Sequence, residues 1–102
     1  MSATIFEKQG TTLTVKPEGR LDSATSPILE EELKQHLDGV ENMTMDFANL
    51  EYISSAGLRV LLESEKILEE RGGGLRLIHV NARILEVLQL VGFIEIVTVE
   101  ES

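Results

Sequence analysis

Strand-like and helix-like segments alternate along most of this 102-residue chain. The strand-like segments are short and apolar, and each helix-like segment carries apolar residues three and four positions apart. A strand that is followed by a helix and a second strand returns to the same sheet by a right-handed crossover, with the two strands parallel. The expected order is β-β-α-β-α-β-α-β, with strands at 4–9, 12–18, 40–47, 75–80 and 93–99 and helices at 27–37, 54–71 and 82–91. The sequence predicts a single α/β domain, residues 1–102, with a mostly parallel, open sheet.

The first two strands depart from this alternation. Only Gly10 and Thr11 separate them, and a two-residue connection is typical of a hairpin turn. Pro17 and Gly19 follow, and neither residue suits the interior of a strand. We therefore expect an antiparallel hairpin at the N-terminal edge of the sheet.

Capping residues mark the expected helix ends. Ser26 immediately precedes Pro27, which predicts an N-cap hydroxyl and a proline at the first helical position. Asn81 is expected to cap the third helix and Gly92 to end it. The glycines at 72–74 stop the second helix before the next strand. The expected buried stripes are Ile28, Leu29, Leu33 and Leu37 in the first helix, Leu58, Leu61, Leu62, Glu65 and Leu68 in the second, and Ile84, Leu85, Leu88 and Val91 in the third.

Composition excludes several classes of function. The formal net charge is −9, so the chain lacks the basic surface that binds nucleic acid or an anionic membrane. It has no cysteine, and its two histidines, His36 and His79, lie on separate elements, so we expect no metal and no cofactor. The N-terminus does not resemble a signal peptide, and no stretch approaches the roughly 20 apolar residues that span a bilayer. A cytoplasmic domain is expected.

Polar residues follow several of the predicted strands. Because the carboxyl ends of parallel strands meet at one edge of a sheet, the loops that leave them gather there, and function usually gathers with them. These loops are expected to bring together Asp22, Ser23, Thr25, Ser54, Ser55 and His79.

The segment Ser54-Ser55-Ala56-Gly57 opens the second helix and has two interpretations. Serine is a common N-cap, and small residues let a helix approach a sheet closely. One serine suffices as a cap, however, and Gly57 in the first turn costs about 0.8–1 kcal/mol relative to alanine. The second interpretation is that one hydroxyl is displayed for modification. A phosphoryl group there would be tolerated by the helix dipole, yet would add about −1.5 to −2 charges to a protein interface.

The central segment DFANLEYISSAGLRVLL, residues 46–62, resembles the signature of the STAS domains, and in particular of the bacterial anti-sigma factor antagonists. The flanking segments GRLDSATSPILEEELKQHL and LRLIHVNARILEVLQLVGF are similar to the same family, so the resemblance covers the whole chain. It implies a single STAS-type domain that is not an enzyme. It also implies two partners: an anti-sigma factor with serine kinase activity, which the unmodified protein binds so that a sigma factor is released, and a serine phosphatase.

The resemblance also implies roles for individual residues. Alignment on Gly57 and Leu58 places the phosphorylated serine at Ser55, with Ser54 as second choice because it replaces the family's aspartate. Asp22 corresponds to a loop aspartate that contacts the partner. The expected partner surface comprises Asp22, Ser23, Thr25, Ser54, Ala56, Gly57, Arg59, Val60, Glu63 and Ile67, the last four on the second helix away from its leucine stripe.

Two alternatives lead to different functions. Ser55, His79 and either Asp22 or Asp46 have the residue types of a hydrolase triad, but the chain has no Gly-x-Ser-x-Gly elbow and little length for a substrate pocket. Within the STAS family, a constitutive adaptor subunit of a transport or sensory complex would use the same serines as contacts, without phosphorylation.

Overall fold

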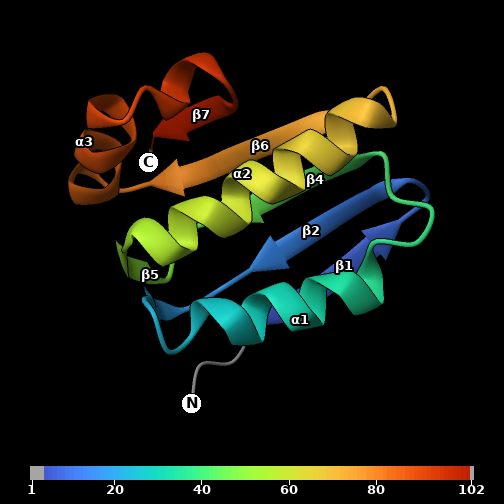
Figure 1. The fold of residues 1–102 in the computed structure, drawn as a ribbon, viewed down its shortest axis with the longest axis horizontal. Helices are drawn as coiled ribbons and strands as arrows, with labels where there is room; N and C mark the ends of the chain where they lie inside the picture. Colours follow the sequence, from blue (N-terminus) through green and yellow to red (C-terminus); the bar gives the residue numbers. More distant parts are fainter. Residues whose placement is uncertain (1–3, 102) are drawn as a thin grey trace.

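The computed structural model describes residues 4–101, and in them the chain forms one α/β layer structure (Figure 1). A five-stranded sheet has the order β1-β2-β4-β6-β7, in which only the β1–β2 pair is antiparallel. Its strands are β1 (Ile5–Gln9), β2 (Thr12–Lys16), β4 (Asn42–Asp46), β6 (Gly74–Val80) and β7 (Thr98–Glu101). The predicted mostly parallel sheet with an antiparallel hairpin at one edge is confirmed, and β1 and β7 are its two edge strands.

Three helices follow the strands: α1 (Ser26–His36), α2 (Ser55–Glu70) and α3 (Ala82–Leu90). Successive parallel strands are added in one direction across the sheet, so right-handed crossovers place all three helices on the same face. Figure 1 shows α1 and α2 side by side in front of the sheet. Residues on β2 and β4 alternate accordingly, with Leu13, Val15, Met43 and Met45 completely buried under the helices.

A second, two-stranded sheet was not predicted. It pairs β3 (Gly19–Leu21) in parallel with β5 (Leu50–Ile53) at the end of the main sheet where the parallel strands terminate. The sequence indicates no strand at 19–21 or 50–53, because three- and four-residue strands are too short to show a period. Buried side chains of Leu21, Leu50 and Ile53 hold this pair against the core.

The C-terminal segment also differs from expectation. Phe93–Glu95, predicted to begin a strand, forms a 3-10 helix (η1), and the last strand starts only at Thr98. Gly92 ends α3 with a φ of 76°, and the Asn81 side chain accepts a hydrogen bond from the backbone nitrogen of Ile84 at 2.8 Å, both as predicted. Because Gly92 ends α3 with left-handed backbone, the chain turns there, and residues 93–95 do not form an extended strand.

Some helix predictions were wrong. Ser26 is the first residue of α1 and not its N-cap; Thr25 occupies the cap position, and its side chain forms no capping hydrogen bond. Ile28 and Val91 were expected in the buried stripes but are 56% and 53% exposed. Val91 is the C-cap residue beyond the last turn of α3, and the buried face of α1 is narrower than the sequence spacing indicates.

The end of α2 is fixed by close backbone contact. Gly73 donates its N–H to the Leu68 carbonyl, and a Cβ atom at Gly73 would lie only 1.7 Å from the Glu41 carbonyl oxygen. Arg71 also links the end of α2 to the segment before β4, because its guanidinium donates hydrogen bonds to the carbonyls of Leu37 and Val40. The turn after α2 therefore packs directly on the turn before β4.

We predict that Gly73→Ala lowers the free energy of unfolding by about 3 kcal/mol, because the clash is with backbone that cannot rotate away. Gly74→Ala is the control, since its Cβ would lie 3.4 Å from a side-chain oxygen of Glu65, and it should change stability by less than about 1 kcal/mol. Urea denaturation monitored by circular dichroism measures both. Equal stability of the two variants would contradict the close approach at Gly73.

Candidate functional site

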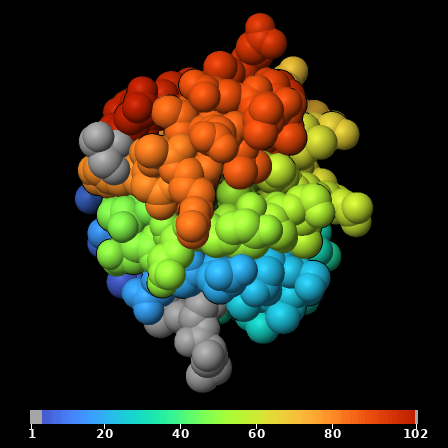
Figure 2. Space-filling view, turned by 90° about the vertical axis from the view of Figure 1, so that its left-hand side faces the viewer, coloured from blue at the N-terminus to red at the C-terminus, as the bar shows by residue number. Residues whose placement is uncertain are grey.

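The candidate site lies where the parallel strands end. Figure 2 views this end of the molecule and shows the start of α1, the start of α2 and the region of α3 stacked across one face. The β3–β5 pair connects them, and the Ser54 N–H donates to the Leu21 carbonyl at 2.8 Å. The loop before α1 and the start of α2 are therefore held together.

The two adjacent serines have different surroundings. Ser55 is the first residue of α2 and is exposed. Ser54 occupies the N-cap position with extended backbone, but its hydroxyl oxygen is buried and has no hydrogen-bond partner among residues 4–101. The Ser55 side chain is therefore accessible from solvent, whereas the Ser54 hydroxyl is not.

Gly57 is explained by packing. It is buried, and a Cβ atom there would lie 2.7 Å from Ile53 Cγ1 and 2.9 Å from Leu21 Cβ. Gly57 was expected to help form the partner surface, but it is buried; the close approach of α2 that it was also expected to allow is confirmed. Gly57 acts indirectly, since it allows α2 to begin tight against β3 and β5.

The loop before α1 is organised by Asp22. Its carboxylate accepts hydrogen bonds from the backbone nitrogens of Ala24 at 2.9 Å and Thr25 at 3.0 Å. These bonds, with that of Thr25 foremost, lower the pKa of Asp22 below its ordinary value of 3.8, and the nearby Arg20 guanidinium contributes. The Thr25 hydroxyl is engaged in the loop too, because it donates to the Arg20 carbonyl. Ser23 is exposed at the tip.

On α2, the expected partner residues divide into two groups. Arg59 and Glu63 are exposed, as predicted, and Ala56 is half-buried. Val60 was predicted on the outer face but is only 5% exposed, and Ile67 is half-buried. The reason is that α1 packs along this side of α2, so both residues line the groove between the two helices.

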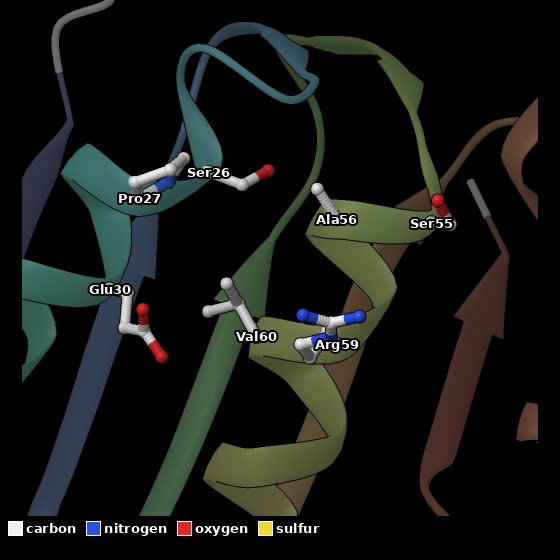
Figure 3. Close-up of a pocket in the computed structure, with 7 residues that line it drawn as sticks. All are labelled: Ser26, Pro27, Glu30, Ser55, Ala56, Arg59 and Val60. Carbon is white, nitrogen blue, oxygen red and sulfur yellow. The ribbon is translucent and has the colours of Figure 1, made fainter.

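A notch of about 190 Å³ opens between the starts of α1 and α2. We refer to it as the α1–α2 notch; it is lined by Ser26, Pro27, Glu30, Ser55, Ala56, Arg59 and Val60. Figure 3 shows Ser26 and Glu30 on the α1 wall and Ala56, Val60 and Arg59 on the α2 wall, with Ser55 at the rim. Sequence reasoning missed the contribution of α1, since the Ser26-Pro27 pair was interpreted only as a helix start.

His79 forms a separate pair at the same end of the sheet. Its Nδ1 lies 2.8 Å from Asp46 Oδ1, and its φ of 55° is left-handed. Partial burial raises the pKa of Asp46, but hydrogen bonds from His79 and from the Ala48 N–H outweigh it and lower that pKa below 3.8. Of the residues of the triad alternative, Asp46 and His79 are paired, but no hydrogen bond joins Ser55 to His79 in the described part of the chain.

Neither a candidate metal cluster nor a candidate membrane span occurs within residues 4–101. No group of three or more histidine, cysteine, aspartate or glutamate side chains is placed to hold a metal ion. No helix in this range is long and apolar enough to cross a membrane.

Comparisons with known proteins agree with this geometry. The family model of the STAS domain matches residues 3–102. BtrV of Bordetella bronchiseptica, described as a candidate anti-sigma factor antagonist, is 38% identical over 86 residues, or 83% of this chain and 74% of BtrV. A candidate anti-sigma factor antagonist from Thermotoga maritima has a crystal structure with a TM-score of 0.89 at 18% identity, covering 97% of this chain and 86% of that one.

A third comparison concerns a modified protein. The phosphorylated form of the Bacillus cell fate determinant SpoIIAA has a TM-score of 0.75 at 19% identity, covering 95% of this chain and 90% of that one. At these identities the two solved structures establish the shared fold.

The Asp22 loop generates a prediction about pH. Because the folded-state pKa of Asp22 is depressed, its contribution to stability is present above pH 3.8 and is lost as the pH falls through the folded-state pKa. Asp22→Asn should therefore flatten the decline of the unfolding free energy between about pH 4.5 and pH 2.5. Asp38→Asn is the control, because the Asp38 carboxylate accepts no hydrogen bond within the described residues. Urea titrations at each pH measure the slopes, and an unchanged slope in Asp22→Asn would refute the role of the carboxylate.

Proposed function

Since the chain belongs to the STAS domain family, we propose that it is an anti-sigma factor antagonist, which acts by binding and not by catalysis. The family model covers nearly the whole chain, and BtrV, at 38% identity, carries this description. In its unmodified form the protein would bind an anti-sigma factor in the cytoplasm and so release a sigma factor for transcription.

The observation that carries this proposal is the exposure of Ser55 at the first turn of α2, beside the ordered Asp22 loop. A partner seated on this face would contact the loop and the exposed side of α2 together. We propose that its contacts include Asp22, Ser23, Ala56, Arg59 and Glu63. Thr25 would act by holding the Asp22 loop in shape, and Val60 and Ile67 by supporting α2 against α1.

Phosphorylation of Ser55 would switch this binding off. The Ser55 oxygen would form an ester bond to the γ-phosphorus of a nucleoside triphosphate, as the bond to the leaving nucleoside diphosphate breaks and the hydroxyl proton passes to a base of the kinase. The product carries about −1.5 to −2 charges at the centre of the proposed surface. A partner would have to desolvate that charge on docking, so its affinity falls while the fold is preserved.

Two partners complete the proposed cycle. The anti-sigma factor would itself be the serine kinase, and a serine phosphatase would restore the binding form. An acidic chain with net charge −9 has few places where added negative charge is neutralised. The modification would thus change the electrostatics of this surface strongly, whereas it would perturb the buried core little.

We predict that Ser55→Asp weakens binding to the cognate anti-sigma factor at least about tenfold, or about 1.4 kcal/mol, and leaves the melting temperature within about 2 °C. Ser55→Ala is the matched control and should bind like the unmodified protein. Isothermal titration calorimetry against each purified anti-sigma factor kinase of the host measures the affinities. Equal affinity of both variants, with no phosphate on Ser55 by intact-mass spectrometry of the native protein, would favour the constitutive adaptor.

A further inference from the structure

The α1–α2 notch contains a polar group that the fold does not use. Ser26 is only 2% exposed, and its hydroxyl has no hydrogen-bond partner among the described residues. Figure 3 shows this oxygen directed across the notch towards Ala56 in the first turn of α2. A buried hydroxyl without a partner costs about 1–3 kcal/mol. Ser26 lines the notch, so a change of its χ1 rotamer would bring this unused hydroxyl within reach of a ligand atom bound there.

The facing wall is positively polarised. Arg59 is exposed, lines the notch and makes no ion pair within residues 4–101. The Ser54 side chain does not cap α2, so the positive end of that helix dipole has no side-chain acceptor. Glu30 on the α1 wall is the one carboxylate that lines the notch. The Asp22 carboxylate, in the neighbouring loop, is already occupied by backbone N–H groups.

We propose that Arg59 and Ser26 bind the phosphoryl group of modified Ser55 in the α1–α2 notch. Ser55 and Arg59 are four positions apart on α2, a spacing that brings Cβ atoms to about 6 Å and favours the acidic group N-terminal to the basic one. In Figure 3 the Ser55 hydroxyl is turned away from Ser26. The modified side chain therefore reaches the notch by changing its χ1 rotamer.

This inference rests on the proposed phosphorylation of Ser55 and adds a second element to the switch. Arg59 belongs to the proposed partner surface, and one guanidinium cannot serve the partner and the phosphoryl group equally. Modification would thus do more than add charge, because it would also withdraw a hydrogen-bond donor from the partner. Arg59 is a positioning residue for the phosphoryl group in this arrangement.

The test uses the full chain with phosphoserine inserted at position 55 during translation, which requires no kinase. The pKa of the phosphoryl group is read from its ³¹P chemical shift between pH 4 and pH 8, since free phosphoserine titrates near about 6. We expect Arg59→Gln to raise this pKa by about 0.5 units, because it removes the cation that favours the dianion. Ser26→Ala should produce a smaller rise.

Lys66→Gln is the matched control. Lys66 is an exposed cation on α2 without an ion pair in the described range, about 16 Å further along the helix axis from Ser55. Its removal changes the net charge equally but should leave the phosphoryl pKa within about 0.1 units. Equal pKa values in the Arg59→Gln and Lys66→Gln proteins would overturn the proposal.

A second experiment distinguishes binding of the phosphoryl group on Ser55 from binding of free phosphate. Inorganic phosphate is titrated into the unmodified chain while the Arg59 side-chain N–H resonance is followed. If free phosphate shifts that resonance and Arg59→Gln leaves the phosphoserine pKa unchanged, the notch binds a free anion, and the proposal is refuted. The proposed function can fail independently of this proposal. In that case Arg59 lowers the phosphoryl pKa as expected, but the phosphoserine protein still binds the anti-sigma factor as tightly as the unmodified protein.

Discussion

The close approach of α2 to the β3–β5 pair is the contact on which the site depends. Gly57 packs where a side chain would collide with Leu21 and Ile53, and the Ser54 N–H binds the Leu21 carbonyl. These two contacts fix both the position and the rotation of the first turn of α2. Rotation of a helix by one residue, about 100°, would exchange the exposed Ser55 with a half-buried neighbour. The buried glycine thus determines which serine faces solvent.

Much of the architecture could be predicted from the sequence because it depends on long, periodic segments. The leucines of α2, the alternation in β2 and the cap at Asn81 each indicate their element through local chemistry. The β3–β5 pair could not be predicted, because strands of three and four residues carry no measurable period and their pairing joins segments about 30 positions apart in sequence. The 3-10 helix at Phe93 was missed for a related reason, since an apolar run after a glycine suits a buried strand equally well.

The candidate site was predictable in part. The resemblance to the STAS signature singled out Ser55 and Asp22, and the expected topology placed their loops at one end of the sheet, where the structure has them. Val60 and Ser26 could not be assigned correctly, because their environment is set by the packing of α1 on α2, two helices whose contact no local pattern reports. The difference between Ser54 and Ser55 is of the same kind. The two side chains are identical, and they differ in exposure only because the backbone directs them to different sides.

The edge strands of the sheet have a consequence for how such a protein persists in a cell. Edge strands expose unpaired backbone groups that can recruit a strand from another copy, and charged side chains oppose this. Here β1 carries Glu7 and Lys8, and β7 ends in Glu100 and Glu101. Under the proposed function, the protein would compete for its partner only in proportion to its free concentration. The charged edges disfavour self-association through the sheet, and so help to keep that concentration equal to the amount synthesised.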